Sequence, residues 1–262
     1  MNKILSISVA LALVLLTACD EKSMDERFEK VEISVARNVL IEDFTGQRCV
    51  NCPTAADELA RLQETYGEDH VVVVAIHSGP FGHRSTMTSP RLSLCTEAGD
   101  DYYSHWGVMA QPSAQVNRSG SLLESTSEYA TAIAAELQKA TPLTLSLTPN
   151  YDAESRKLTV SLHASSTESR AGRYQVWLTE SGIVDAQSMP DGSRKTDYVH
   201  NHVFRTSLTS DLYGDDFSVN VGEAWDEDVS TTLDPAWKPE NMSIVAFVYT
   251  DAGVEQVVTA KF

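Results

Sequence analysis

The chain has 262 residues, of which 42% are hydrophobic and 22% are charged, and it contains no low-complexity tract. This composition is typical of a globular protein, and the length allows two domains of ordinary size. The formal net charge is −17, and Lys and Arg form no cluster, so a nucleic acid is excluded as an expected partner because an acidic surface repels phosphates.

Residues 1–18 have the pattern of a secretory signal. Lys3 gives a positive start, and the apolar run that follows is too short to cross a bilayer as a stable helix. The segment Leu16 to Ala18 resembles a bacterial lipobox, which implies cleavage before Cys19 and attachment of diacylglycerol to its sulfur. Residues 19–34 are rich in charge and are predicted to form a lipid anchor and an acidic tether. We therefore expect a membrane-anchored lipoprotein of the bacterial cell envelope.

The next segment has the order strand, cysteine pair, helix, strand. Residues 35–44 are apolar and β-branched, as in a buried strand. After Cys52 the apolar residues recur at helical spacing, Pro53 stands early in the helix, and Gly67 marks its end. Residues 71–76 are a continuous apolar run, which predicts a central strand buried on both faces. This order predicts a βαβ unit.

Three further elements complete the predicted first domain, residues 35–141. Residues 90–105 predict one or two short helices that contain Cys95, and residues 113–117 predict a short strand. A capping box at Ser125–Glu128 predicts the start of a last helix. We expect these elements to pack around the βαβ unit as one α/β domain.

Residues 142–262 have the pattern of an all-β domain. Apolar and polar positions alternate in five segments, separated by Asn, Asp, Gly and Pro: 143–147, 158–162, 174–178, 217–221 and 243–249. About seven short strands with no convincing helix between them predict an immunoglobulin-like β-sandwich. In such a sandwich each sheet has one packed face and one face toward solvent.

Cys49 and Cys52 stand between the first predicted strand and its helix. A thiol at a helix N-terminus faces unpaired N–H groups and the positive end of the helix dipole, and both stabilise its thiolate. Cys49 is therefore predicted to be the nucleophile, and Cys52 can fold back as the resolving thiol. A static structural disulfide is the alternative, because cysteines outside the cytoplasm are expected to be oxidised. So short a loop gains little stability from closure, which weakens this alternative.

The stretch VLIEDFTGQRCVNCPTAADEL, Val39 to Leu59, resembles the active-site segment of thioredoxins, and WGVMAQP resembles their cis-proline turn. The resemblance implies a thioredoxin-like α/β fold. It also implies that Pro112 is the cis proline and that Asp43 is the buried acid that accepts a proton from the resolving thiol. Arg48 stands where thioredoxins have Trp, and Val50-Asn51 where they have Gly-Pro, so the direction of exchange and its potential are left open.

The remaining cysteine and the histidines are not assigned chemistry. Cys95 is predicted to be a buried apolar side chain, and a zinc site that joins it to the cysteine pair is disfavoured because no second CxxC exists. His200 and His202 are expected on one face of a strand, without a third metal ligand. His77 and His83 flank a loop and are interpreted as loop structure. No metal or other cofactor is expected.

The lipobox, the thioredoxin-like segment and the β-sandwich occur together with the stretches VHNHVFR and WKPENMSIVAFVY. This combination resembles the Omp28-related lipoproteins, which implies a location at the outer membrane, on its periplasmic face or at the cell surface. Two functions follow as hypotheses. The protein is either a thiol-disulfide oxidoreductase, with protein thiols or disulfides of the envelope as partners, or a non-enzymatic binding or adhesion lipoprotein with a structural disulfide.

Overall fold

The computed structural model describes residues 37–87 and 92–262. These residues belong to one compact unit, Glu32–Phe262. The predicted signal peptide, lipid anchor and tether lie outside the described residues, as do the first two residues of the predicted helical segment 90–105. Within the two described ranges, no helix combines the length and the apolar character that crossing a membrane requires.

The predicted βαβ unit is confirmed. Strand β1 (Val39–Thr45) leads through the cysteine pair into helix α1 (Cys52–Tyr66), and strand β2 (Val71–His77) then pairs parallel to β1. Pro53 lies in the first turn of α1, and Gly67 follows its end with a φ of 98°, which a glycine adopts without strain. Every residue of β1 and β2 is buried, as the continuous apolar run of β2 predicted.

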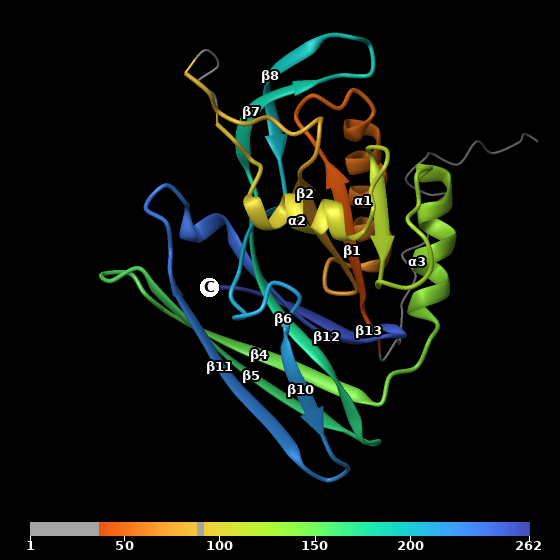
Figure 1. The fold of residues 1–262 in the computed structure, drawn as a ribbon, viewed down its shortest axis with the longest axis vertical. Coiled ribbons are helices and arrows are strands. Elements are labelled where there is room, and N and C mark those ends of the chain that lie inside the picture. The colour runs from red at the N-terminus through yellow and green to blue at the C-terminus, as the bar shows by residue number, and fades with distance from the viewer. Residues whose placement is uncertain (1–36, 88–91) are drawn as a thin grey trace, which may run out of the picture. The chain divides into compact units, whose positions relative to one another are not determined.

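Both strands are buried because helices cover both faces of the sheet (Figure 1). On one face, β1 and β2 pack against α1 and against helix α3 (Tyr129–Leu137). On the other face lies helix α2 (Glu97–His105), whose Tyr102 is fully buried. Strand β3 (Ser113–Val116) pairs antiparallel to β1 at the edge.

Two local predictions in this region differ from the structure. Helix α2 begins at Glu97, capped by the Thr96 hydroxyl, which accepts a hydrogen bond of 3.0 Å from Gly99 N, so Cys95 precedes the helix. The predicted capping box is not formed, because the Ser125 hydroxyl bonds to the hydroxyl of Ser127 instead. A single 3₁₀ turn, η2 (Thr126–Glu128), therefore leads into α3.

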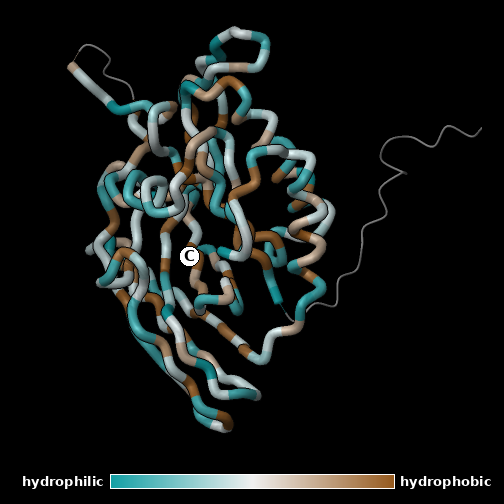
Figure 2. The backbone as a smooth tube through the Cα atoms, turned by 45° about the vertical axis from the view of Figure 1, so that its right-hand side comes forward, coloured by the Kyte–Doolittle hydropathy of each residue, from teal (hydrophilic) through white to brown (hydrophobic). Residues whose placement is uncertain are grey.

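The second half of the chain contains two facing sheets. The smaller sheet has the order β11-β5-β4. Its partner is formed by β10, β6, β12 and β13, and a common apolar core lies between the two sheets. The strands are β4 (Leu143–Asp152), β5 (Lys157–Ser166), β6 (Arg170–Glu180), β10 (Asp215–Val219), β11 (Ala224–Thr232), β12 (Met242–Thr250), with the short turn η3 (Pro239–Asn241) before it, and β13 (Gly253–Lys261). Figure 2 shows hydrophobic and hydrophilic residues alternating along these strands, which is the period that predicted them.

One sheet joins both halves of the described chain. Its order is β13-β12-β6-β9-β2-β1-β3, and β9 (Val203–Ser207) links the second-half strands to β2 through the pair Ala75 and Val203. As a consequence, β6 and β12 are covered on both faces, and Trp177 of β6 packs against Tyr102 of α2 with ring centroids 5.1 Å apart. The expectation of a solvent-facing side is wrong for these two strands.

The start of the described chain is fastened to its last strand. Asn38 N donates a hydrogen bond of 2.9 Å to the side chain of Gln256, and Asn38 Nδ2 donates one of 2.9 Å to Val257 O. Both partners belong to β13, which ends one residue before the C-terminus. The entry into β1 is thus held by residues more than two hundred positions away.

A hairpin that the sequence analysis did not predict lies beside the cysteine pair. Its strands, β7 (Ile183–Ser188) and β8 (Arg194–His200), pair antiparallel with each other. Figure 1 shows the hairpin at the top of the view, above the end of β1 from which the cysteine loop emerges. This position makes the hairpin part of the candidate site.

Candidate functional site

Cys49 and Cys52 form a disulfide at the start of α1, with their Cα atoms 5.4 Å apart. The disulfide agrees with the predicted pairing. Both residues are buried, with exposed fractions of 2% for Cys49 and 3% for Cys52. The sulfur that the sequence predicts as the nucleophile is therefore not presented to solvent, in contrast to what attack on a large partner requires.

The hairpin strand β7 covers the cysteine loop. Gln187 Nε2 donates a hydrogen bond of 2.8 Å to Cys49 O, and Ser188 N donates one of 2.9 Å to Gln47 O. In the opposite direction, Gln47 Nε2 donates to Asp185 Oδ2 at 2.8 Å. Backbone and side chains of β7 thus hold the loop from Gln47 to Cys49 in place.

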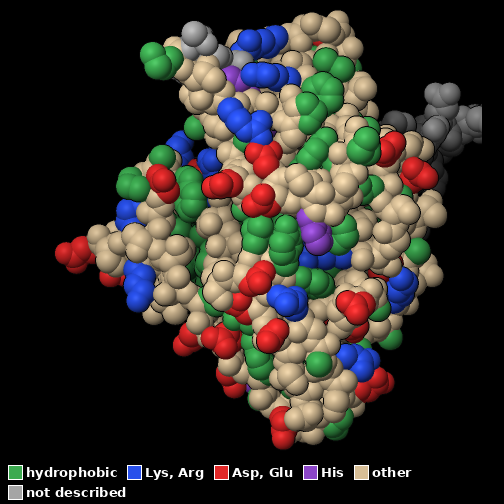
Figure 3. All heavy atoms as spheres, in the orientation of Figure 1, with side chains coloured by type: hydrophobic (Ala, Val, Ile, Leu, Met, Phe, Trp, Pro, Cys, Tyr) green, Lys and Arg blue, Asp and Glu red, His purple; other side chains and the backbone are tan. Residues whose placement is uncertain are grey.

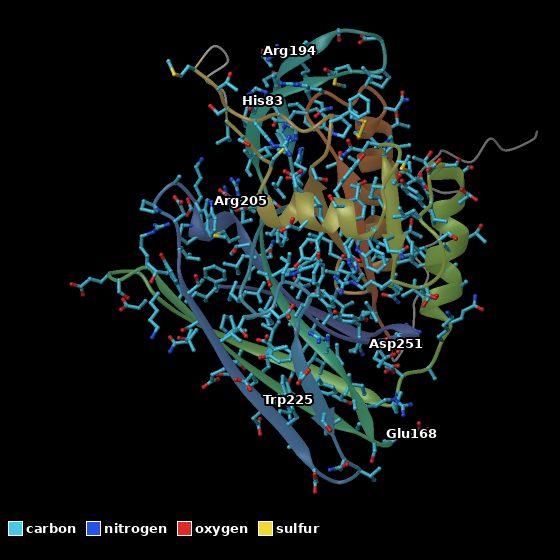
Figure 4. The ribbon with its side chains drawn as sticks, in the orientation of Figure 1. His83, Glu168, Arg194, Arg205, Trp225 and Asp251 are labelled. Carbon is cyan, nitrogen blue, oxygen red and sulfur yellow. A yellow bond between two sulfur atoms is a disulfide. The ribbon has the colours of Figure 1, made fainter. Side chains whose placement is uncertain are left out.

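The loop after β2 supports the cysteine loop from another side. Arg48 N donates a hydrogen bond of 3.0 Å to Phe81 O, and a Cβ atom at Gly46 would lie 2.3 Å from the same oxygen, so only glycine fits there. The Arg48 guanidinium lies 3.3 Å from His83 Nδ1. Figure 4 places His83 just below Arg194 of the hairpin, and Figure 3 shows Lys and Arg gathered at this end of an otherwise acidic molecule.

Asp43 occupies the face of β1 that is turned toward α1. It is buried, and its Oδ1 atom has no hydrogen-bond partner among the described residues. Burial raises the pKa of the Asp43 carboxyl to about 7. A carboxyl group with this pKa can both take up and release a proton near neutral pH.

Asp43 and Cys52 meet at a cavity of about 290 Å³ between α1, the strands β1 and β2, and the hairpin strand β8. Three histidines also line it: His77 from β2, His200 from β8, and His202, which follows β8. The rings of His77 and His200 are 5.2 Å apart. His77 Nδ1 and His200 Nε2, like Asp43 Oδ1, have no protein partner in the described part of the chain. Three buried polar atoms are therefore left for a bound molecule to satisfy.

His77 and His200 are neutral at pH 7, and burial also lowers the pKa of His202, the third histidine that lines the cavity. Burial lowers the pKa of His200 to about 4. The pKa of His77 lies well below its ordinary value, first because of burial and second because His200 and Arg205 are near. The cavity therefore contains uncharged imidazoles, and Asp43 has no positive histidine beside it.

Pro112 is preceded by a cis peptide bond, as its resemblance to the thioredoxin proline implied. The side chain of Gln111 donates hydrogen bonds of 2.7 Å to Thr45 O and 3.1 Å to Ser78 O, at the ends of β1 and β2. Pro112 does not line the cavity that joins Asp43 to Cys52. The structure thus brings Asp43 and Cys52 together at the cavity, and Cys49 is bonded to Cys52.

The other predicted residues are placed as follows. Cys95 has no disulfide partner and is half-buried, not fully buried as predicted; its Sγ lies against Gly82, and partial burial raises the pKa of its thiol to about 11. Cys19, the predicted site of lipid attachment, lies outside the described residues. His202 follows β8 with a φ of 55°, so it does not share a strand with His200 as predicted. In residues 37–87 and 92–262, no group of three His, Cys, Asp or Glu side chains is arranged to hold a metal ion.

The place of His77 in the cavity lining was not predicted from the sequence. His77 was interpreted as loop structure, although it is the last residue of β2 and points to the same face as Asp43 does from β1. The period of two in β2 could have revealed its direction, since Val73 and Ala75 of the same face also line the cavity. The contact between His77 and His200 could not be predicted, because no pattern in the sequence near His200 indicates where the hairpin of β7 and β8 lies.

Known structures with a similar fold define the class of protein to which the chain belongs. The chain is a β-rich protein with the fold of HBP35 of Porphyromonas gingivalis, with a TM-score of 0.65 and 14% identity over 87% of this chain and 76% of that chain. At this identity the likeness concerns the fold alone. Residues 99–262 match the family model described as outer membrane protein Omp28, so the chain belongs to the Omp28 family.

Two other comparisons add little. A domain of the outer membrane lipoprotein Omp28 from Porphyromonas gingivalis is 22% identical over 47% of this chain and 90% of that chain, with a TM-score of 0.33. No curated protein matches the sequence. The predicted location as an outer membrane lipoprotein of the bacterial envelope is confirmed by membership of the family.

Proposed function

We propose that the protein is an anchored outer membrane lipoprotein that exchanges thiols and disulfides through Cys49 and Cys52. The observation that carries the proposal is the position of Asp43, whose unpaired, buried carboxyl shares a cavity with Cys52 and has a pKa of about 7. A structural disulfide has no need of such a group, whereas exchange needs a base that takes the proton of a thiol.

The surroundings of the cysteine pair support the same function. The pair stands where β1 passes into α1, so both sulfurs are near the positive end of a helix dipole, which favours a thiolate over a thiol. The βαβ unit, the cis peptide bond before Pro112 and the buried Asp43 together support a thioredoxin-like domain at residues 35–141, followed by a sandwich domain at residues 142–262.

The anchor belongs to the proposal as well. Lipid attachment at Cys19, followed by the acidic tether to residue 34, would hold the exchange site close to the membrane. The partners would then be thiols or disulfides of the cell envelope.

A redox titration of the full-length lipoprotein in detergent micelles tests the proposal. The protein is equilibrated in glutathione buffers, and the free thiols are counted after alkylation, with Cys49→Ser as the control. We expect a reversible two-electron transition above about −250 mV that the control lacks. A pair that stays oxidised below about −300 mV contradicts the proposal, because such a disulfide does not exchange with cellular thiols.

A second candidate function is a non-enzymatic binding or adhesion lipoprotein in which the disulfide is structural. The burial of both cysteines and the hydrogen bond from Gln187 to Cys49 favour it. The same titration distinguishes the two candidate functions, since a structural disulfide should stay oxidised below about −300 mV. A binding function would then be sought on the sandwich strands.

A further inference from the structure

Cys52 is the cysteine of the pair that lines an open space. It lines the cavity between α1 and β8, and Cys49 does not. On the other side, the loop that carries Cys49 is bonded to β7 through Gln187 and to the loop after β2 through Phe81. A molecule that enters the cavity therefore meets Cys52 without displacing either of these segments.

The size of this cavity limits what can reach Cys52. Its volume of about 290 Å³ lies at the lower end of the range for small-molecule sites, which is about 300 to 1,000 Å³. A folded client protein presents its cysteine on a surface far too broad to enter. The substrate that fits is a small molecule with its own thiol.

Charged side chains that line the cavity further limit the class of substrate. Asp57 of α1 and Lys195 of β8 both line the cavity and are exposed to solvent, so they keep their charges at low cost. Opposite charges on two walls suit a ligand that carries an ammonium and a carboxylate group. Asp43, His77 and His200 also line the cavity, and each has an unpaired polar atom that can form a hydrogen bond with the same ligand.

We propose that exchange begins at Cys52 rather than at Cys49, and that the substrate is a small zwitterionic amino thiol that enters between α1 and β8. This inference rests on the proposed function and reverses the roles that the sequence pattern predicts for the two cysteines. Metal binding is not a competing use of this cavity in its described conformation, because the donor atoms are not grouped for it.

The step balances with two thiol molecules. The first loses its proton to Asp43 and attacks Cys52 Sγ. The bond between the two cysteine sulfurs breaks, Cys49 leaves as a thiolate and takes up a proton, and a mixed disulfide remains on Cys52. The second thiol attacks the substrate sulfur of this mixed disulfide. It releases the oxidised substrate disulfide and leaves Cys52 as a thiol, so that two electrons pass to the protein. When the substrate is supplied as its disulfide, the same two steps occur in reverse and oxidise the cysteine pair.

The first experiment compares the two cysteines as single thiols. Full-length protein carrying Cys95→Ser is prepared with either Cys49→Ser or Cys52→Ser, and each variant is treated with cystine while intact mass spectrometry records the mixed disulfide. We expect the thiol of Cys52 to react at least about tenfold faster than that of Cys49, because Cys52 lines the cavity and Cys49 does not. In denaturant the two rates should become similar.

A second experiment does not depend on the folding of those variants. The protein with both cysteines present is reduced by cysteine and quenched with acid, and peptide mapping identifies the residue that carries the mixed disulfide. We expect Cys52. Cysteamine lacks the carboxylate and N-acetylcysteine lacks the ammonium group, so both should react more slowly than cysteine after correction for their thiol pKa values.

Variants of the two charged side chains complete the test. Asp57→Asn and Lys195→Gln should each slow the reaction with cysteine about tenfold and leave the reaction with 2-mercaptoethanol unchanged. The matched controls are Glu64→Gln on the same helix and Arg194→Gln on the same strand, neither of which lines the cavity. A mixed disulfide on Cys49 overturns the inference and leaves the proposed function intact. A disulfide that no thiol reduces in the folded protein overturns both.

Discussion

Gln187 Nε2 donates a hydrogen bond of 2.8 Å to the carbonyl oxygen of Cys49, a residue 138 positions earlier in the chain. The same nitrogen lies within hydrogen-bond distance of Gly46 O and Ser188 O, so one buried amide group joins the hairpin to the cysteine loop. The hairpin is therefore the element that decides how accessible Cys49 is.

Replacing Gln187 by Ala should expose the cysteine loop. The change leaves buried carbonyl groups without a donor, so the free energy of unfolding should fall by about 1–3 kcal/mol. In the reduced protein Cys49 should react faster with iodoacetamide, while Cys95 should react at an unchanged rate. Thr196→Ala, at an exposed position of the same hairpin, is the matched control. Equal alkylation of Cys49 in both variants would show that the hairpin does not shield it.

Asp43 should make the folded protein less stable as the pH rises. Burial raises its pKa from 3.8 to about 7, so the folded state keeps a proton that the unfolded state releases between these values. Stability from this group is complete below pH 3.8 and is lost as the pH rises to about 7. Asp43→Asn should therefore gain stability over the unchanged protein across this interval, by at most about 4 kcal/mol. Urea unfolding at several pH values measures the difference.

His200 should have the opposite dependence. Burial lowers its pKa from 6.5 to about 4, so the unfolded state takes up a proton that the folded state refuses. The stability that this group contributes is complete above pH 6.5 and is lost as the pH falls to about 4. His200→Gln should remove this loss at low pH. Because Asp43 acts in the other direction over much of the same interval, the comparison has to be made between variants at each pH. A constant difference between His200→Gln and the unchanged protein would contradict the assignment.

The ion pair between Arg118 and Glu42 should be one of the costliest to break. Both guanidinium contacts to the carboxylate measure 3.0 Å, and the side chains are only 5% and 0% exposed. Arg118→Met should lower the free energy of unfolding by about 3–5 kcal/mol, because it leaves Glu42 buried without a partner. The double variant with Glu42→Met should recover much of this loss.

An exposed ion pair provides the comparison. Glu168, labelled in Figure 4, pairs with Arg170 at the surface, where its side chain is 64% exposed. Glu168→Gln should change the free energy of unfolding by less than about 1 kcal/mol. If Arg118→Met also changed the free energy of unfolding by less than about 1 kcal/mol, the Glu42 carboxylate could not be left buried without a partner, and water would have to take the place of the guanidinium.

The sequence predicted the elements whose pattern is local. The apolar run of β2 and the helical spacing after Cys52 specified the βαβ unit, and the alternation in β4, β5, β6, β10 and β12 specified the sandwich strands. A strand was predicted at His200 and His202, but β7, the pairing of β7 with β8, and β9 as a separate strand were not. These strands are short and mixed in polarity, and contacts with distant segments arrange them. Asp43 and Cys52 were predicted as a site through the resemblance to thioredoxins, whereas the approach of His77 to His200 depends on the path of the hairpin and was not predicted.

The hydrogen bonds from Asn38 to β13 have a mechanical consequence. A pull on the N-terminal side of the described chain is transmitted at once to Gln256 and Val257, next to the C-terminal end. A force applied at the N-terminal side of the described chain therefore acts on β1 and on β13 together, although several strands separate these two in the strand order of the sheet. For a protein tethered through its N-terminus, shear at the cell envelope would strain the last strand of the sandwich before it reached the disulfide.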